Sequence, residues 1–212
     1  YFATSIAPDP ATGQSLWGFA LAVAGMAIAL LSPVLGAIAD ASGRRKPWIA
    51  AFGAVLVLGS SALWIGVPGD HAVIPPVLIA VALASVGAEF ATVFNNAMMP
   101  TLVPPERIGR LSGTGWATGY VGGIVSLILV LGFLAANPET GRTLLGFAPL
   151  FGLDPATHQG DRITGPLTGL WFIVFVTPMF LFTPDYPAKR PVRQALRAGL
   201  AELKQSLAEL PR

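Results

Sequence analysis

Long apolar runs separated by short polar stretches dominate the sequence from one end to the other. A helix needs about 20 apolar residues to cross the hydrocarbon core of a bilayer. Five runs meet that length, and a single charged residue, Glu89, interrupts them. We therefore predict five complete membrane-spanning helices, over residues 16–38, 47–67, 75–97, 111–136 and 163–184. Buried helices of a large soluble protein are the lesser alternative, because so little polar sequence separates the runs.

The composition agrees with an all-α integral membrane protein. Hydrophobic residues make up 53% of the chain and charged residues only 11%, whereas a soluble domain carries about 25% charged residues. The net charge of +2 is too small to suggest a nucleic-acid partner. The lipid bilayer is the expected environment.

Both ends suggest a piece of a longer chain. The sequence starts at Tyr1 rather than Met, and "YFATSIAPDP" has the character of the last turn of a preceding membrane helix. Near the other end, apolar residues recur at steps of three and four over residues 192–210, which predicts an amphipathic helix. We expect a helical bundle in residues 1–185, made of five complete spans plus the end of a first, and a linker in residues 186–212.

The distribution of cations predicts the orientation of the spans. Eleven of the thirteen lysines and arginines fall in residues 39–47, 98–110 and 185–212, which follow alternate spans. Cytoplasmic loops of membrane proteins carry such an excess. These three segments should therefore be cytoplasmic, and a bacterial inner membrane is the expected location. The opposite connection, residues 137–162, is apolar in part, so we expect an interfacial hairpin or short helix there, with a substrate lid as the alternative.

The first cytoplasmic turn combines small, acidic and basic residues at fixed spacing. Asp40 stands near the carboxyl end of a helix, where an anion is unfavourable, so it needs a cationic or amide partner. A topology anchor would explain the cations but not the spaced glycines. The pattern comprises Gly36, Ala39, Asp40, Gly43, Arg44, Arg45 and Lys46.

This pattern resembles the signature loop between the second and third helices of the major facilitator superfamily. The resemblance implies the amino-terminal six-helix half of a twelve-helix secondary transporter, whose carboxy-terminal half is a further partner. It also implies that this loop, residues 36–46, takes part in an ion-pair latch that closes the cytoplasmic side, with Asp40 and Arg44 among the latch residues. The segments "EFATVFNNAMMP", "RLSGTGWATGYVGG" and "FLFTPD" are similar to the vacuole effluxer family and its bacterial relatives. Fungal members of that family are implicated in exporting amino acids.

Glu89 is the most informative single residue. A charged group at the bilayer centre costs about 2.5–3.5 kcal/mol on insertion scales. It stands roughly eight residues, or about 12 Å, from the cytoplasmic end of its span, so it should face protein or water. It either binds a cationic group of a solute, carries a coupling proton, or pairs with a structural partner.

Other candidates accompany Glu89 on this span and the next. Asn96 is seven residues from Glu89 and shares its helical face, whereas Asn95 is turned by about 100°. Trp116 and Tyr120, four apart, either line a solute cavity or serve as packing or interfacial aromatics. Three glycines at steps of four would let another helix approach closely, and these are Gly115, Gly119 and Gly123.

No pattern of enzymatic chemistry is present in the sequence. His71 and His158 have no partners at metal-ligand spacing, and no phosphate-binding loop with its lysine occurs. We expect no catalytic residue, metal or cofactor. The sequence therefore predicts a secondary transporter that moves a small solute, with amino acids as one candidate class, coupled to an ion gradient such as that of protons. A membrane scaffold that kept the fold without transport is the alternative.

Overall fold

The computed structural model describes residues 1–42, 44–185 and 194, without the side chains of residues 37 and 40–42. The predicted amphipathic helix and the linker lie outside these residues, apart from position 194. Five helices are long and apolar enough to cross a membrane, which confirms the predicted all-α architecture of five spans. They are α1 (Pro10–Ser42), α2 (Lys46–Ala62), α3 (Ile74–Asn96), α5 (Pro105–Leu129) and α7 (Thr164–Phe182).

Short helical turns extend or connect the spans. Two are single α-helical turns, α4 (Met99–Leu102) and α6 (Gln159–Arg162), and two are π-helical, η1 (Phe2–Ile6) and η4 (Val130–Leu134). Three 3-10 turns complete the described chain, and these are η2 (Leu63–Ile65), η3 (His71–Val73) and η5 (Leu150–Gly152).

Local sequence signals decide where the helices begin. α1 starts at Pro10, earlier than its apolar run, because the Asp9 carboxylate accepts hydrogen bonds of 3.0 Å from the backbone N–H groups of Ala11 and Thr12. An aspartate cap followed by proline is a favoured helix start. α5 likewise begins at Pro105 rather than at residue 111, with Glu106 in its first turn, where the helix dipole favours an anion.

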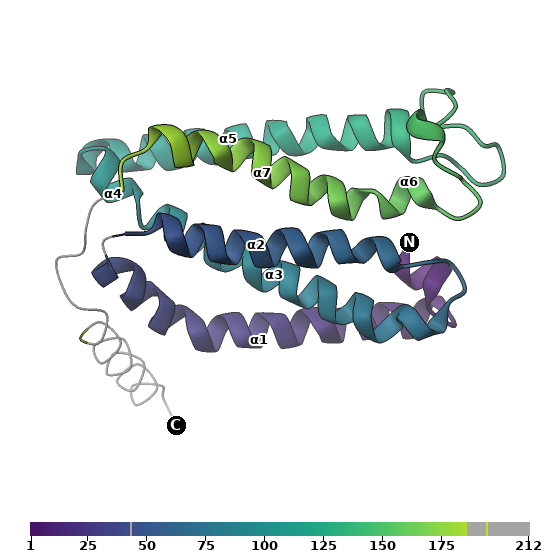
Figure 1. The fold of residues 1–212 in the computed structure, drawn as a ribbon, viewed down its shortest axis with the longest axis horizontal. Helices are drawn as coiled ribbons and strands as arrows, with labels where there is room; N and C mark the ends of the chain where they lie inside the picture. Colours follow the sequence, from purple (N-terminus) through teal and green to yellow (C-terminus); the bar gives the residue numbers. More distant parts are fainter. Residues whose placement is uncertain (43, 186–193, 195–212) are drawn as a thin grey trace.

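The five long helices run side by side along the longest dimension of the molecule. Helices α5 and α7 lie on one side and α1 on the other, with α2 and α3 between them (Figure 1). Helix α2 packs against both α3 and α7, and α3 also packs against α1. Helix α3 is therefore held on two sides, which fixes the direction of its remaining face.

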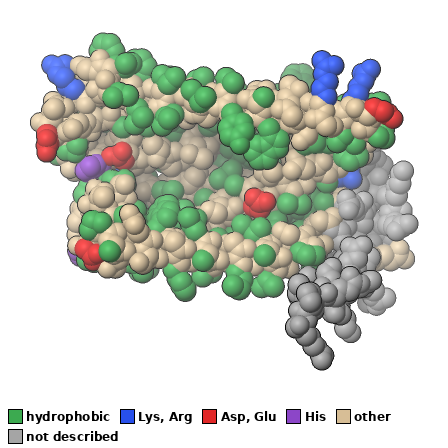
Figure 2. All heavy atoms as spheres, turned by 180° about the vertical axis from the view of Figure 1, so that it is seen from behind, with side chains coloured by type: hydrophobic (Ala, Val, Ile, Leu, Met, Phe, Trp, Pro, Cys, Tyr) green, Lys and Arg blue, Asp and Glu red, His purple; other side chains and the backbone are tan. Residues whose placement is uncertain are grey.

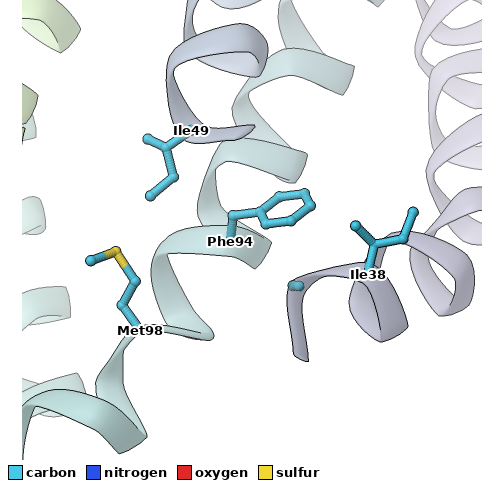
Figure 3. Close-up of a cluster of buried hydrophobic side chains, with 5 residues drawn as sticks. Ile38, Ile49, Phe94 and Met98 are labelled. Atoms are coloured by element: carbon cyan, nitrogen blue, oxygen red, sulfur yellow. The ribbon is translucent and has the colours of Figure 1, made fainter. Parts of the chain in front are cut away.

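Two apolar clusters hold the bundle near its two ends. One joins Ile38 and Ala39 of α1, Ile49 of α2, Phe94 of α3 and Met98, whose side chains converge in the space between the helices (Figure 3). The other cluster, at the end where the chain begins, contains Phe2, Ile6 and Val77. Sequence positions far apart are thus brought together at each end.

Between these clusters, two glycines set the close approach of α2 and α3. A Cβ atom added at Gly59 would lie 2.8 Å from the Ala80 carbonyl oxygen, and one added at Gly87 would lie 2.7 Å from the Phe52 carbonyl oxygen. Either contact is closer than carbon and oxygen atoms tolerate. The helix backbones therefore touch at two points because neither residue has a side chain.

The outer surface suits lipid rather than water. Figure 2 shows most charged side chains at the two ends, with hydrophobic and uncharged groups over most of the length between them and an acidic group near the middle. Large apolar side chains face outward on several helices, such as Phe19 of α1 and Phe182 of α7, which are 70% and 81% exposed. Such large exposed apolar surfaces mark sites of contact with membrane or partner.

Candidate functional site

The carboxylate of Asp185 closes the start of α2. Its two oxygens accept hydrogen bonds from the backbone N–H groups of Arg45, at 2.9 Å, and Lys46, at 3.2 Å. The Lys46 ammonium donates a further bond of 2.8 Å to the carbonyl oxygen of Phe180, in the last turn of α7. A carboxylate at a helix amino terminus satisfies unpaired N–H groups and complements the helix dipole, so this contact ties α7 to α2.

Three of the predicted latch residues, Arg44, Arg45 and Lys46, form or border this contact. The Arg45 side chain is buried and Arg44 is exposed, and Arg44 lines a hollow of about 440 Å³ together with Lys46, Phe180 and Asp185. Ala39 is buried as expected, whereas no described atom lies within 4 Å of a Cβ added at Gly36. Gly43 and the Asp40 side chain lie outside the described residues, so the Asp40–Arg44 latch stays a prediction.

Glu89 lies on the free side of α3. Its side chain is exposed on the bundle, whereas Gly87 and Phe94 are buried; at 100° per residue they lie about 160° and 140° around the helix from it. No hydrogen bond or ion pair among the described residues engages the Glu89 carboxylate. Helix α3 therefore presents the carboxylate within a candidate membrane span, on the side opposite its buried residues Gly87 and Phe94.

The two asparagines diverge, as their spacing predicts. Asn96 is exposed on the same face as Glu89. Asn95 lines a separate groove of about 440 Å³ between α2, α3 and α7, where Thr92 and Thr168 are also polar and Trp171 is among the apolar walls. Asn96, rather than Asn95, therefore lies on the same face of α3 as Glu89.

The aromatic and glycine candidates of α5 all face open space. Trp116 and Tyr120 are 60% and 70% exposed, and their ring centroids lie 6.2 Å apart. No described atom comes within 4 Å of a Cβ added at any of the three glycines predicted for helix packing, Gly115, Gly119 and Gly123. Any helix that packs on this face of α5 lies outside the described residues, so that prediction stays open.

The opposite end of the bundle carries polar contacts that sequence reasoning missed. The Arg162 guanidinium lies 4.6 Å above the Trp64 ring and donates hydrogen bonds of 2.9 and 2.6 Å to the Trp64 carbonyl oxygen. His158 Nδ1 is 2.8 Å from the Asp161 carboxylate. The His158–Asp161 contact is local to α6, whereas the Arg162 contacts anchor α6 to η2, directly after α2. The segments around α2 and α7 are therefore joined at both ends of the bundle.

A short turn before α6 is fixed by a carboxylate. Asp154 accepts hydrogen bonds from the Thr157 hydroxyl, at 2.7 Å, and from the Ala156 backbone N–H, at 3.0 Å. These bonds, chiefly the one from Thr157, hold the pKa of the Asp154 carboxyl below its ordinary value. The turn is therefore best ordered when Asp154 is ionised.

Signals for some missed residues were present in the sequence. Asp185 directly follows the last apolar run and shares the cation-rich side with Arg44–Lys46, so a pairing across that side was open to prediction. The pairing of Arg162 with Trp64 carried no such signal, because neither residue stands in a recognisable motif. Chemically, the arrangement offers a lone carboxylate within the membrane, an exposed aromatic pair, and a polar fastening at one end.

Comparison with known proteins agrees with this architecture. The family described as "Vacuole effluxer Atg22 like" matches residues 10–212. The chain is 25% identical over 163 residues to an uncharacterized MFS-type transporter, YxiO, of Bacillus subtilis (strain 168). That alignment covers 76% of this chain and 35% of the relative, so the chain spans about a third of the length of the curated relative it matches. No solved structure shows a significant match.

Proposed function

Because this chain belongs to the Atg22-like vacuole effluxer family and is an integral, multi-pass membrane protein, we propose that it forms part of a secondary transporter. In this proposal a small solute crosses the membrane by alternating access, driven by an ion gradient. The exposed faces of α3 and α5 contribute to the solute pathway, and the carboxy-terminal half of the same transporter supplies the rest.

The position of Glu89 carries this proposal. Placing a carboxylate within a membrane span is costly, and it is retained here without a hydrogen-bonding or ionic partner among the described residues. A scaffold gains nothing from such a group, whereas a transporter uses one to bind a solute cation or carry a proton. Asn96 on the same face adds a hydrogen-bonding group about two helical turns further along.

The cation-rich end is proposed as cytoplasmic, in a bacterial inner membrane. The excess of lysine and arginine in residues 39–47, 98–110 and 185–212 supports this orientation. At this end the contact of Asp185 with the start of α2 keeps two helices of the bundle together as one rigid unit. We propose that this unit moves as a whole while Arg44 and Asp40 engage or release the partner half.

Amino acids are the first solutes to test. Their ammonium group suits a carboxylate, and their carboxylate and side chain suit the amide and aromatic groups that α3 and α5 present. The full-length protein, reconstituted in proteoliposomes with an imposed proton gradient, should accumulate or release a radiolabelled amino acid.

Glu89→Gln tests the role of the carboxylate, with Glu139→Gln as the matched control because Glu139 is exposed in a polar loop. We expect net transport to fall to background in the first variant and to stay at wild-type level in the control. Solute exchange without a gradient separates the roles: retained exchange identifies a proton carrier, and lost exchange a solute-binding group. Wild-type net transport by Glu89→Gln would contradict the proposal.

A further inference from the structure

A hairpin of mixed character connects α5 to α6, at the end of the bundle where the chain begins (Figure 1). Ala136 and Thr143 form an antiparallel bridge, and the Asn137 backbone N–H donates to the Arg142 carbonyl oxygen at 3.0 Å. The turn between them is polar, but no charged residue occurs between Arg142 and Asp154. We call residues 136–152 the α5–α6 hairpin.

The apolar part of the hairpin lies beside the membrane span rather than beyond it. The Leu144 backbone N–H donates a 3.0 Å hydrogen bond to the Leu131 carbonyl oxygen. The Phe147 ring stacks on Phe133, with centroids 6.1 Å apart and planes 5° from parallel. Leu131 and Phe133 belong to the fourth apolar span, Pro105–Leu134, so the returning strand sits level with the last turn of that span.

Part of the hairpin backbone, between Thr143 and Phe147, is paired internally. The Thr143 N–H donates to the Phe147 carbonyl oxygen at 2.9 Å, and the Gly146 N–H donates to the Thr143 carbonyl oxygen at 2.8 Å. The Phe147 N–H donates to the Thr143 hydroxyl at 3.2 Å. Non-helical backbone needs such pairing in hydrocarbon, where water is absent, whereas a loop in water does not.

Several apolar side chains of the hairpin are left exposed by the rest of the described bundle. Leu144 and Phe151 are 79% and 90% exposed, and Leu145, Phe147 and Leu150 are also exposed. Phe151 has φ of 60°, a left-handed conformation that is an outlier for a bulky residue. The structure therefore accepts backbone strain while leaving a large apolar ring uncovered by any described residue.

From these observations we infer that the α5–α6 hairpin enters the bilayer, and that Leu144 and Phe151 contact lipid acyl chains. Lipid is the occupant because the apolar surface is continuous with the exposed side of a membrane span. Arg142 marks the boundary: its guanidinium donates to the Gly146 carbonyl oxygen at 2.8 Å, from where a long cationic side chain reaches the headgroups. This inference rests on the membrane spans and is independent of transport.

Site-specific fluorescence tests the depth of the hairpin. Single cysteines are introduced into the full-length protein at Leu144, Phe151 and, as the water-exposed control, Glu139; the 212 residues contain no other cysteine. Each variant is labelled with an NBD fluorophore and reconstituted in phosphatidylcholine vesicles. Quenching is then measured with spin-labelled lipid and with aqueous iodide.

We expect labels at positions 144 and 151 to be quenched by spin-labelled lipid and to show several-fold weaker iodide quenching than the label at 139. Iodide quenching equal to that at position 139 would overturn the inference in favour of a loop in water. Protection from both quenchers would also overturn it, in favour of a protein surface that covers the hairpin. As a folding control, Leu144→Ser or Phe151→Ser is combined with the labelled cysteine at position 139. The iodide quenching of that label should be the same as without the serine substitution, which shows that the hairpin keeps its fold.

Discussion

Asp185 and Arg45 are 140 residues apart in sequence but in direct contact in space, with the Asp185 carboxylate 2.9 Å from the Arg45 backbone nitrogen. The same carboxylate also accepts from the Lys46 N–H group. The bond involves the backbone of Arg45, so any residue at position 45 except proline can donate it. Substitution of Asp185 should therefore disrupt this contact more than substitution of Arg45.

Replacing Asp185 tests this fastening. We expect Asp185→Ala to destabilise the protein by about 1 kcal/mol, the usual cost of removing a helix amino-terminal cap. Asp185→Asn should cost less, because its amide oxygen still accepts one of the two bonds. Thermal unfolding of the purified protein in detergent measures both. Equal melting temperatures for Asp185→Ala and the wild type would show that the contact contributes nothing to stability.

Gly87 and Gly119 should respond differently to the same substitution. A Cβ at Gly87 would lie 2.6 Å from the Leu56 backbone nitrogen, whereas a Cβ at Gly119 meets no described atom within 4 Å. We expect Gly87→Ala to cost about 1–3 kcal/mol through forced separation of α2 and α3. Gly119→Ala should leave the stability of residues 1–185 unchanged. Limited proteolysis of the full-length protein, read at the cleavage of residues 1–185, compares the two variants.

A loss of solute transport in Gly119→Ala, without loss of stability, would support the predicted approach of another helix to α5. Wild-type transport in that variant would show that this face of α5 has room for a methyl group.

Trp116 and Tyr120 separate a transport role from an anchoring role. Both rings are largely exposed on the described bundle, so Trp116→Ala and Tyr120→Ala should not loosen its core. If the rings line the solute pathway, each variant lowers the initial transport rate at wild-type membrane abundance. If they instead anchor or pack, abundance and melting temperature fall while transport per molecule is kept. Flux and abundance measured together on the same vesicles decide between these outcomes.

The turn at Asp154 should depend on pH. The hydrogen bonds from Thr157 and Ala156 lower the pKa of Asp154 in the folded protein, so its ionised form stabilises the turn above the unfolded value of about 3.9. That contribution is lost as the pH falls through the lower, folded pKa. We expect amide hydrogen exchange at residues 154–159, corrected for the intrinsic rate, to increase as the pH falls through the folded pKa of Asp154.

Thr157→Val removes the principal bond to the carboxylate. In this variant the increase in exchange should begin at a higher pH than in the wild type. Identical pH profiles for the two proteins would show that the Thr157 hydroxyl does not set the pKa of Asp154.

Helix identity was predictable because it depends on neighbouring residues. The uncharged run in residues 163–184 predicted a span, and α7 occupies Thr164–Phe182. The helix starts were less well predicted, since the Asp9 cap of α1 and the first residue of α5, Pro105, lie outside the apolar runs. The divergence of Asn95 from Asn96 followed directly from helical periodicity.

The contacts that join the helices were not predictable. They bring together residues that are far apart in sequence, and helical periodicity relates only neighbouring residues. Glycine spacing favoured Gly115, Gly119 and Gly123, yet within the described chain other glycines, such as Gly59 and Gly87, make close helix contacts. Spacing shows only that an approach is permitted; which helix approaches depends on the packing of the whole bundle. The direction of Glu89 was likewise fixed only when α1 and α2 covered the other side of α3.

By itself the sequence determined that the chain forms five lipid-length helices and where their charged turns fall, because burial of apolar length in a bilayer is a property of each segment alone. Only the tertiary structure decided that Asp185 closes α2, that Glu89 faces away from its packed neighbours, and that the α5–α6 hairpin folds back beside Leu131. Each of these depends on contacts between segments distant in sequence, and such contacts exist only once the helices have packed.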